Sequence, residues 1–168
     1  MVVNPALFSS NKQTYETPNW LFQVASRLYG PFDLDAAATR SNTKCARYFT
    51  ELDDSLSQDW IADKVWINPP YGRTTTGKFV RKAYNEVWEC HCNRVVMLLP
   101  ARTDTKWFHT YCTQGTIVFI KGRLKFENAK NNAPFPSMLV IFDIDTLGVR
   151  PPDGFCRMST DTLEGWHM

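Results

Sequence analysis

The sequence lacks the features that mark several common classes of protein. No stretch approaches the ~20 consecutive apolar residues of a membrane span, so no membrane partner is expected. The first residues lack the charged start and apolar run of a signal peptide. The five cysteines are odd in number and irregularly spaced, which argues against a disulfide framework. We therefore expect a protein of the reducing cytoplasm.

Internal repeats and low-complexity segments are also lacking, which favours an ordinary globular chain. Its 168 residues are 43% hydrophobic, enough for one core. We expect one domain spanning residues 1–168. The polar residues 1–13 and the Pro- and Gly-rich residues from about 150 to 168 are expected to be loosely ordered tails.

The net charge is small, but charge is unevenly distributed along the chain. The formal net charge is +2, yet residues 64–130 hold 12 Lys and Arg against four Asp and Glu, a local charge of +8. The remainder holds 7 against 13, a local charge of −6. A basic surface of this kind favours a polyanionic substrate, most simply nucleic acid. Solvated helix faces and a charged hairpin would give the same count.

Apolar patterns alternate between those typical of strands and of helices. Strands are expected at 32–35, 48–49, 64–68, 94–99, 116–120 and 138–142, and helices at 18–30, 36–46, 77–90 and 105–112. Residues 122–126 alternate as in a hairpin before a loop at 127–136. This order describes an α/β, doubly wound, mostly parallel sheet with a C-terminal antiparallel hairpin strand.

Three helices carry specific expectations. In the first, Thr17 is expected as the N-cap and Pro18 as the first helical residue. Its inward face is predicted as Trp20, Leu21, Val24 and Leu28. The second helix should bury Phe79, Val80, Ala83 and Val87, and the third should be capped by Thr103 or Asp104.

One turn carries the most chemistry. The apolar run 65–67 ends at Asn68 and is followed by Pro69, Pro70 and Tyr71. Proline fixes φ and donates no hydrogen bond, so the chain leaves the strand in a stiff, extended turn. Asn68 Oδ1 and a proline-flanked carbonyl would accept both hydrogens of a planar amine, while Tyr71 stacks on its ring. A purely structural Pro-Pro turn at a sheet edge is the alternative.

The Asn-Pro-Pro-Tyr turn matches the motif of amino-methyltransferases that use S-adenosylmethionine, and the chain as a whole resembles the phage-type DNA N-6-adenine methyltransferases, the Dam family. The resemblance runs from about Tyr15 to Phe142. Its ordered pieces are Glu16-Thr17-Pro18, Phe32-Asp33-Leu34-Asp35-Ala36-Ala37, Lys44-Cys45-Ala46-Arg47-Tyr48-Phe49, Val65-Trp66-Ile67-Asn68-Pro69-Pro70-Tyr71-Gly72, Leu98-Leu99-Pro100-Ala101-Arg102 and Lys121-Gly122-Arg123-Leu124-Lys125-Phe126. It implies a Rossmann-like methyltransferase sheet.

The resemblance also implies a cofactor site for S-adenosylmethionine, without a metal. Thr17 and Pro18 match the segment lining the methionine end, and Asp35 matches the acid that holds the cofactor. Ala36 and Ala37 let the backbone approach it, although the Gly-x-Gly of the wider superfamily is absent here. A charged strand end is the alternative for Asp35.

Two further positions complete the expected cofactor contacts. Asp54 matches the acid that meets the cofactor's adenine amine, and an N-cap for residues 55–60 is its alternative. Asn68 is expected to touch the cofactor as well as the substrate.

The implied reaction is methylation of the adenine N6 amine in double-stranded DNA. Asn68, Pro69, Pro70 and Tyr71 form the expected catalytic set. A base must leave the duplex to reach such a pocket. The expected substrate-binding residues are Tyr71, Arg73, Lys78, Arg123 and Lys125. We expect a phage- or prophage-encoded protein of the bacterial cytoplasm.

The sequence is also compatible with other functions. The same turn serves methyltransferases of RNA base amines and protein glutamine amides, and a DNA-binding relative that has lost catalysis would keep the basic surface. Cys90-His91-Cys92 with His109 and Cys112 offers zinc ligands, but their spacing fits no standard finger.

Overall fold

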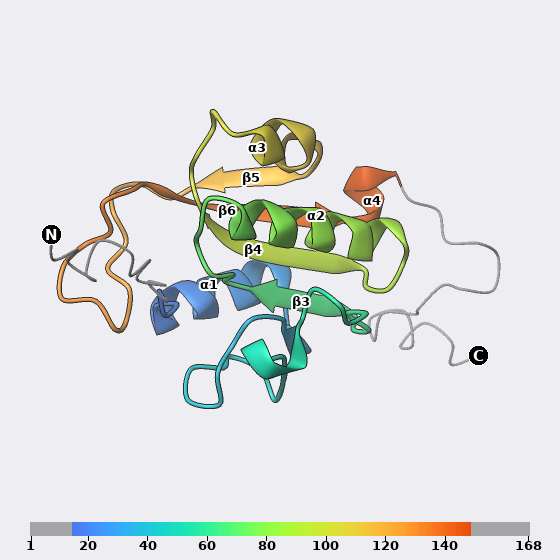
Figure 1. Ribbon diagram of the computed structural model, residues 1–168, viewed down its shortest axis with the longest axis horizontal. Helices are drawn as coiled ribbons and strands as arrows, with labels where there is room; N and C mark the ends of the chain where they lie inside the picture. The colour runs from blue at the N-terminus through green and yellow to red at the C-terminus, as the bar shows by residue number, and fades with distance from the viewer. Residues whose placement is uncertain (1–14, 149–168) are drawn as a thin grey trace, which may run out of the picture.

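A computed structural model describes residues 15–148 and has a mixed α/β architecture built on a six-stranded sheet (Figure 1). The predicted tails at 1–13 and 150–168 lie outside the described residues. The strands are β1 (Leu34–Asp35), β2 (Arg47–Tyr48), β3 (Lys64–Ile67), β4 (Arg94–Pro100), β5 (Thr116–Phe119) and β6 (Ser137–Asp143). The helices are α1 (Asn19–Tyr29), α2 (Thr75–Trp88), α3 (Lys106–Thr110) and α4 (Ile144–Leu147), with 3-10 turns η2 (Glu51–Asp53) and η3 (Cys112–Gln114).

The sheet has the order β2-β1-β3-β4-β6-β5 and is mostly parallel. β1 pairs in parallel with β2 and β3, and β3 pairs in parallel with β4. β6 lies between β4 and β5 and is antiparallel to both. The predicted C-terminal antiparallel strand is confirmed as β6, but its predicted hairpin partner at 122–126 is wrong, because β6 pairs with β5 and β4 instead. Residues 122–126 form no strand, but Leu124 and Phe126 still point inward and are buried.

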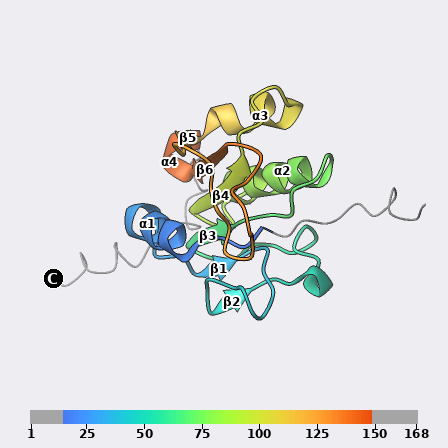
Figure 2. The same cartoon turned by 90° about the vertical axis from the view of Figure 1, so that its left-hand side faces the viewer.

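Helices cover both faces of this sheet, which explains the uninterrupted apolar runs of its central strands. Leu21 and Ala25 of α1 pack with Trp66, Val96 and Leu98 on one face. The alternate strand residues face α2 and α3, as with Val95 and Met97. Figure 2 shows α1 and α2 on opposite sides of the strands. The predicted inward face of α2 is confirmed, since Phe79, Val80, Ala83 and Val87 are all buried.

The start and inward face of the first helix differ from the prediction. Pro18 is the N-cap because its carbonyl accepts the first helical hydrogen bond, from the Phe22 N–H, and Thr17 is not the cap. Leu21 and Ala25 are buried, whereas Trp20, Val24 and Leu28 are 55%, 43% and 64% exposed. The prediction placed the apolar face too far around the helix because it counted Trp20 as inward.

Two further expectations were wrong. Residues 36–46 form turns rather than a helix, organised by the Asp35 carboxylate, which accepts hydrogen bonds from the Ala37 and Lys44 N–H groups. The cap of α3 is Thr105, whose hydroxyl accepts from the Phe108 N–H, rather than Thr103 or Asp104.

The strand ends lie where the sequence predicted them. β1 ends at Asp35, β3 at Ile67 immediately before Asn68, and β4 at Pro100. Because these three strands are parallel neighbours, their carboxyl ends meet at one end of the sheet, called here the carboxyl end. The opposite end, where β3 and β4 begin, is called the amino end. No helix within residues 15–148 is long and apolar enough to cross a membrane.

Candidate active site at the carboxyl end of the parallel strands

The Asn-Pro-Pro-Tyr turn leaves β3 at the carboxyl end and leads into α2. Ile67 and Pro69 are buried, which anchors the turn between the strand and the core. The Gly72 N–H donates to Thr76 Oγ1 at 3.0 Å, which ties the exit of the turn to the first turn of α2. The predicted catalytic residues are thus held at both ends by regular structure.

The amide of Asn68 is held on its nitrogen side. Nδ2 donates to the Tyr15 carbonyl at 2.5 Å and to Thr17 Oγ1 at 3.1 Å. Exchanging the amide oxygen and nitrogen would set the oxygen against the Tyr15 carbonyl, so the hydrogen bonds fix the assignment. The segment predicted to line the cofactor therefore lies directly against the predicted catalytic amide.

The oxygen of the same amide has no partner. Asn68 Oδ1 is buried and accepts no hydrogen bond from any residue between 15 and 148. The buried hydroxyls of Ser55 and Ser137 share this condition. A buried acceptor left unpaired costs about 1–3 kcal/mol, and such groups in folded proteins call for an explanation. The carboxyl end of β3 thus presents a fixed hydrogen-bond acceptor suited to an incoming donor.

Tyr71 sits in a cluster of four aromatic rings. Its ring stacks on Tyr15, with centroids 5.3 Å apart and an interplanar angle of 29°, and meets Phe135 edge-on at 5.6 Å. Phe126 lies 6.4 Å from it. The Tyr71 hydroxyl donates to the Leu98 carbonyl at 3.1 Å, and burial raises the pKa of Tyr71 well above its ordinary value. One face of the predicted stacking platform is therefore covered by Tyr15.

The loop between β5 and β6 binds the segment before α1. The Glu127 N–H donates to the Glu16 carbonyl at 3.0 Å, and Asn128 Oδ1 accepts from the Glu16 N–H at 3.2 Å. Glu127 Oε1 accepts from the Asn19 N–H at 2.8 Å, which places a carboxylate at the start of α1, where the helix dipole favours negative charge. These contacts fasten residues 16–19 over the Asn-Pro-Pro-Tyr turn.

Asp35 ends β1 in a buried position, 3% exposed. Burial raises the pKa of its carboxyl to about 6, against the opposing effect of hydrogen bonds from the Lys44 and Ala37 N–H groups and of the Lys44 charge. The Ala36 N–H donates to the Trp66 carbonyl of β3, so this strand end adjoins the one that carries Asn68.

An open polar cavity of about 470 Å³ lies between the start of α1 and residues 41–44. It is lined by Glu16, Asn19, Phe22, Ser41, Asn42, Thr43, Lys44 and Glu127. These are chain neighbours of the predicted cofactor residues, but none of the predicted residues lines the cavity itself. Lys44 links the two, because its N–H donates to Asp35 Oδ2 at 3.0 Å.

Asp54, a predicted cofactor contact, lies beyond β2, the edge strand of the sheet. Its side chain is exposed beyond β2, and its φ of 48° lies in the left-handed region. Its carbonyl accepts from the Ser57 N–H and hydroxyl, so the backbone rather than the carboxylate organises residues 55–60. The N-cap alternative for this side chain is not what the contacts show.

The predicted basic contacts are exposed near the carboxyl end. Arg73 and Lys78 lie just before and within the first turns of α2, and Arg123 and Lys125 point outward between the buried Leu124 and Phe126. None of these four cations forms an ion pair with another residue of the 15–148 segment. Their charges are available to a polyanion.

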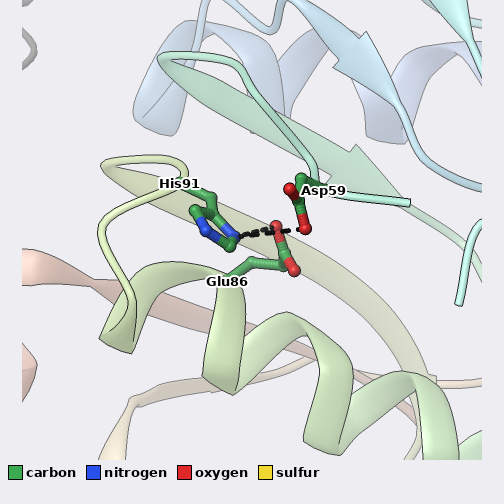
Figure 3. A group of neighbouring side chains, drawn as sticks. All are labelled: Asp59, Glu86 and His91. Atoms are coloured by element: carbon green, nitrogen blue, oxygen red, sulfur yellow. Dashed lines mark hydrogen bonds and ion pairs between the residues drawn. The ribbon is translucent and has the colours of Figure 1, made fainter. Parts of the chain in front are cut away.

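Asp59, Glu86 and His91 each place one possible ligand atom within 4.8 Å of the other two (Figure 3). Glu86 is already engaged: Oε1 pairs with Lys82, and Oε2 accepts from the Trp60 N–H at 2.6 Å and lies 3.0 Å from His91 Nδ1. A cation would compete with Lys82 for this carboxylate. The cysteines of the sequence pattern do not belong to this group, so the ligand set considered from spacing is not assembled.

Comparison with known proteins settles the family. The sequence model of the DNA N-6-adenine-methyltransferase (Dam) family matches residues 5–145. The chain belongs to the Dam family. The resemblance carried by the ordered motifs is thereby confirmed, and with it the prediction of an adenine-specific DNA methyltransferase at the level of the family.

Two Dam relatives from phages share this similarity. The DNA N-6-adenine-methyltransferase of Haemophilus phage HP1 (strain HP1c1) is 35% identical over 144 residues, which cover 80% of each chain. That of Escherichia phage T1 is 37% identical over 98 residues, covering 58% of this chain and 40% of the phage T1 protein.

Sequence reasoning overlooked two residues of the Dam chain that shape the site. Tyr15 supplies both a carbonyl for Asn68 and a ring for Tyr71. Glu127 fastens the loop between β5 and β6 to α1. The signal for Tyr15 was its position beside Thr17 and Pro18, whereas Glu127 acts across 108 residues and leaves no local pattern.

Proposed function

We propose that this protein transfers a methyl group from S-adenosylmethionine to the N6 amine of adenine in double-stranded DNA. The observation that carries the proposal is Asn68 Oδ1, a buried acceptor without a partner at the carboxyl end of the sheet. An exocyclic amine is a donor of the kind that this oxygen lacks. Family membership supports the substrate, because the phage relatives are named for it.

In this proposal Asn68 Oδ1 and the Pro69 carbonyl accept the two N6 hydrogens. Both dipoles stabilise the positive charge that develops on nitrogen, and their geometry directs its lone pair toward the methyl group. S-adenosylmethionine supplies the electrophilic methyl group: the amine lone pair forms the new C–N bond while the C–S bond electrons return to sulfur. The amine then releases a proton to solvent, and S-adenosylhomocysteine is the second product.

The cofactor would lie across the carboxyl ends of β1 and β3 in a doubly wound, Rossmann-like arrangement. Thr17 and Pro18 would line its methionine end, and Asp35, Ala36 and Ala37 would border it from β1. Asn68 would touch it from β3, and Asp54 would meet its adenine from beyond β2. The polar cavity beside Lys44, and a buried carboxyl whose pKa is raised to about 6, suit a charged, hydrogen-bonding ligand.

The target base would leave the duplex and stack on Tyr71. Since Tyr15 covers one face of that ring, the Tyr15 ring must turn aside or the base must use the remaining surface. Arg73, Lys78, Arg123 and Lys125 would bind DNA phosphates around the entrance. We infer one methyltransferase domain, phage- or prophage-encoded and acting in the bacterial cytoplasm.

The test is methyl transfer from isotope-labelled S-adenosylmethionine to unmethylated duplex DNA, followed by mass spectrometry of the nucleosides. We expect N6-methyldeoxyadenosine from the wild-type protein and a loss of at least roughly 100-fold in Asn68→Ala, with cofactor affinity retained. Wild-type rates in Asn68→Ala would refute the role of the acceptor. Product on RNA or on protein glutamine, with none on DNA, would refute the substrate.

A further inference from the structure

The catalytic role proposed for Asn68 depends on which side of its amide faces the substrate. A side-chain amide carries an acceptor on one side and two donor hydrogens on the other, and rotation by 180° about the last bond exchanges them. If the amide presented its NH₂ group to the adenine N6 amine, two hydrogen-bond donors would face each other and no hydrogen bond could form. Something in the protein must therefore select the orientation in which Oδ1 is presented.

Two acceptors of one short segment take both amide hydrogens. The Tyr15 carbonyl and Thr17 Oγ1 accept from Asn68 Nδ2 at 2.5 and 3.1 Å. Thr17 is only 5% exposed, so water does not compete freely for its hydroxyl. This hydroxyl does not cap α1, because Pro18 is the N-cap and makes no side-chain cap bond.

We propose that Thr17 is a positioning residue: its hydroxyl, together with the Tyr15 carbonyl, holds the Asn68 amide so that Oδ1 alone faces the target amine. This inference rests on the proposed function and deepens it. It gives the Thr17 hydroxyl a task in the methyl-transfer step, separate from any contact that the same segment makes with the cofactor.

The segment that carries these acceptors is itself held from the other side. The Glu16 backbone makes hydrogen bonds in both directions with residues 127–128, and the Asn19 N–H donates to Glu127 Oε1. The Tyr15 ring adds a stack on Tyr71, which follows Asn68 by three residues. The acceptors are therefore fixed before the substrate arrives, which is what a preorganised site requires.

The experiment compares Thr17→Val, which keeps the branched shape and removes the hydroxyl, with Thr17→Ser, which keeps the hydroxyl. We measure kcat and KM on unmethylated DNA and the affinity for S-adenosylmethionine by calorimetry. We expect Thr17→Val to lower kcat roughly 10- to 100-fold at saturating cofactor, with cofactor affinity within about threefold, and Thr17→Ser to restore most of the rate. The exposed Thr113→Val is the matched control and should behave as the wild type.

A second measurement reads the orientation without activity. The side-chain amide resonances of Asn68, assigned by their disappearance in Asn68→Ala, should shift and exchange faster with solvent in Thr17→Val but not in Thr17→Ser. Unchanged resonances in Thr17→Val would overturn the positioning role. So would a loss of cofactor affinity at unchanged kcat, which would make Thr17 a cofactor contact instead.

Failure of the proposed function looks different from failure of this inference. If Asn68→Ala kept the wild-type rate, the acceptor itself would be unnecessary, whatever Thr17 does. If Asn68→Ala were inactive and Thr17→Val fully active, the role of Asn68 as acceptor would be supported and the positioning role of Thr17 would be refuted. Equal defects in Thr17→Val and Thr17→Ser would also refute the hydroxyl as the cause.

Discussion

The two ends of the sheet use polar residues in opposite ways. At the amino end, the acids are bound to partners. Asp33 Oδ2 accepts from the Asp63 and Lys64 N–H groups, Asp63 Oδ1 accepts from Asn93, and Asp143 accepts from Arg94 at 2.6 Å. Each carboxylate joins the start of one strand to a neighbouring segment. These groups act as part of the fold.

At the carboxyl end, several polar groups have no hydrogen-bond or ion-pair partner among the described residues. Asn68 Oδ1 and the Ser137 hydroxyl, which lies opposite Pro100 in the β4–β6 register, are buried without partners between residues 15 and 148. The nearby cations Arg73, Arg123 and Lys125 are exposed and unpaired within the same range. The difference indicates that residues at the amino end stabilise the fold, whereas residues at the carboxyl end bind ligands. Substitutions at the amino end should therefore lower the unfolding free energy, and those at the carboxyl end should lower methyl transfer or binding.

The largest expected effect is on stability, at Glu86. This carboxylate is 1% exposed and binds Lys82 and the Trp60 N–H. It also lies 3.0 Å from His91 Nδ1 (Figure 3). Glu86→Ala leaves a largely buried ammonium and a buried N–H without partners, so we expect a loss of about 3–5 kcal/mol in the free energy of unfolding, measured in urea. Methyl transfer per folded molecule should stay within about twofold.

Glu89, at the end of the same helix, gives the control. Its side chain is 56% exposed and its carboxylate lies 4.0 Å from His91 Nδ1, so this exposed pair contributes little, and Glu89→Ala should change stability by no more than about 1 kcal/mol. A stable but inactive Glu86→Ala would break the comparison between the two ends. It would place the group of Asp59, Glu86 and His91 in the reaction.

The local features of the site were predictable, because they depend on short-range rules. Proline geometry and the apolar run before Asn68 placed the turn at the end of β3, and the alternation of Leu124 and Phe126 placed Arg123 outside. The inward face of α2 followed from helical spacing.

Features that depend on distant partners were not predictable. The residues around Thr17 predict a helix cap, yet its hydroxyl accepts a hydrogen bond from Asn68, 51 residues away. Residues 36–46 read as a helix until the buried Asp35 carboxylate draws the Ala37 and Lys44 N–H groups into turns. The position of β6 between β4 and β5 likewise depends on pairing that no local pattern records.

Asp35 carries the next expected effect, in the pH dependence of stability. Its folded pKa of about 6 lies above the ordinary 3.8, so folding favours the protonated form. The stabilisation from this group is complete below about pH 3.8 and is lost as the pH rises through 6. The difference is about 3 kcal/mol. The unfolding free energy of the wild type relative to Asp35→Asn should fall by most of that amount, about 2.4 kcal/mol, between pH 4 and pH 7.

Cofactor binding should show the reverse trend if the ionised Asp35 holds the cofactor. Affinity for S-adenosylmethionine, measured by calorimetry, should weaken as the pH falls below about 6, and this dependence should vanish in Asp35→Asn. A pH-independent affinity in the wild type would make Asp35 an organiser of residues 36–46 rather than a cofactor contact. The carboxyl end would then be defined by Asn68 rather than by β1.

The smallest expected effect is on DNA affinity, from Arg123 and Lys125. These side chains project from the loop that Glu127 fastens to the start of α1, so the loop holds their charges at the carboxyl end. Replacing both with Gln should remove about two phosphate contacts. The slope of log affinity against log salt should therefore become shallower by about 2, measured by fluorescence anisotropy on duplex DNA.

Arg27 provides the matched control for this experiment. It is an exposed cation in the last turn of α1, the turn that leads toward the start of β1 at the amino end. Arg27→Gln changes the net charge without touching the carboxyl end, so its salt slope should equal that of the wild type. Equal slopes in all three proteins would remove the loop between β5 and β6 from the DNA interface. The same change of slope per removed charge in both variants would mean that DNA binding depends on the overall charge and does not distinguish the two ends of the sheet.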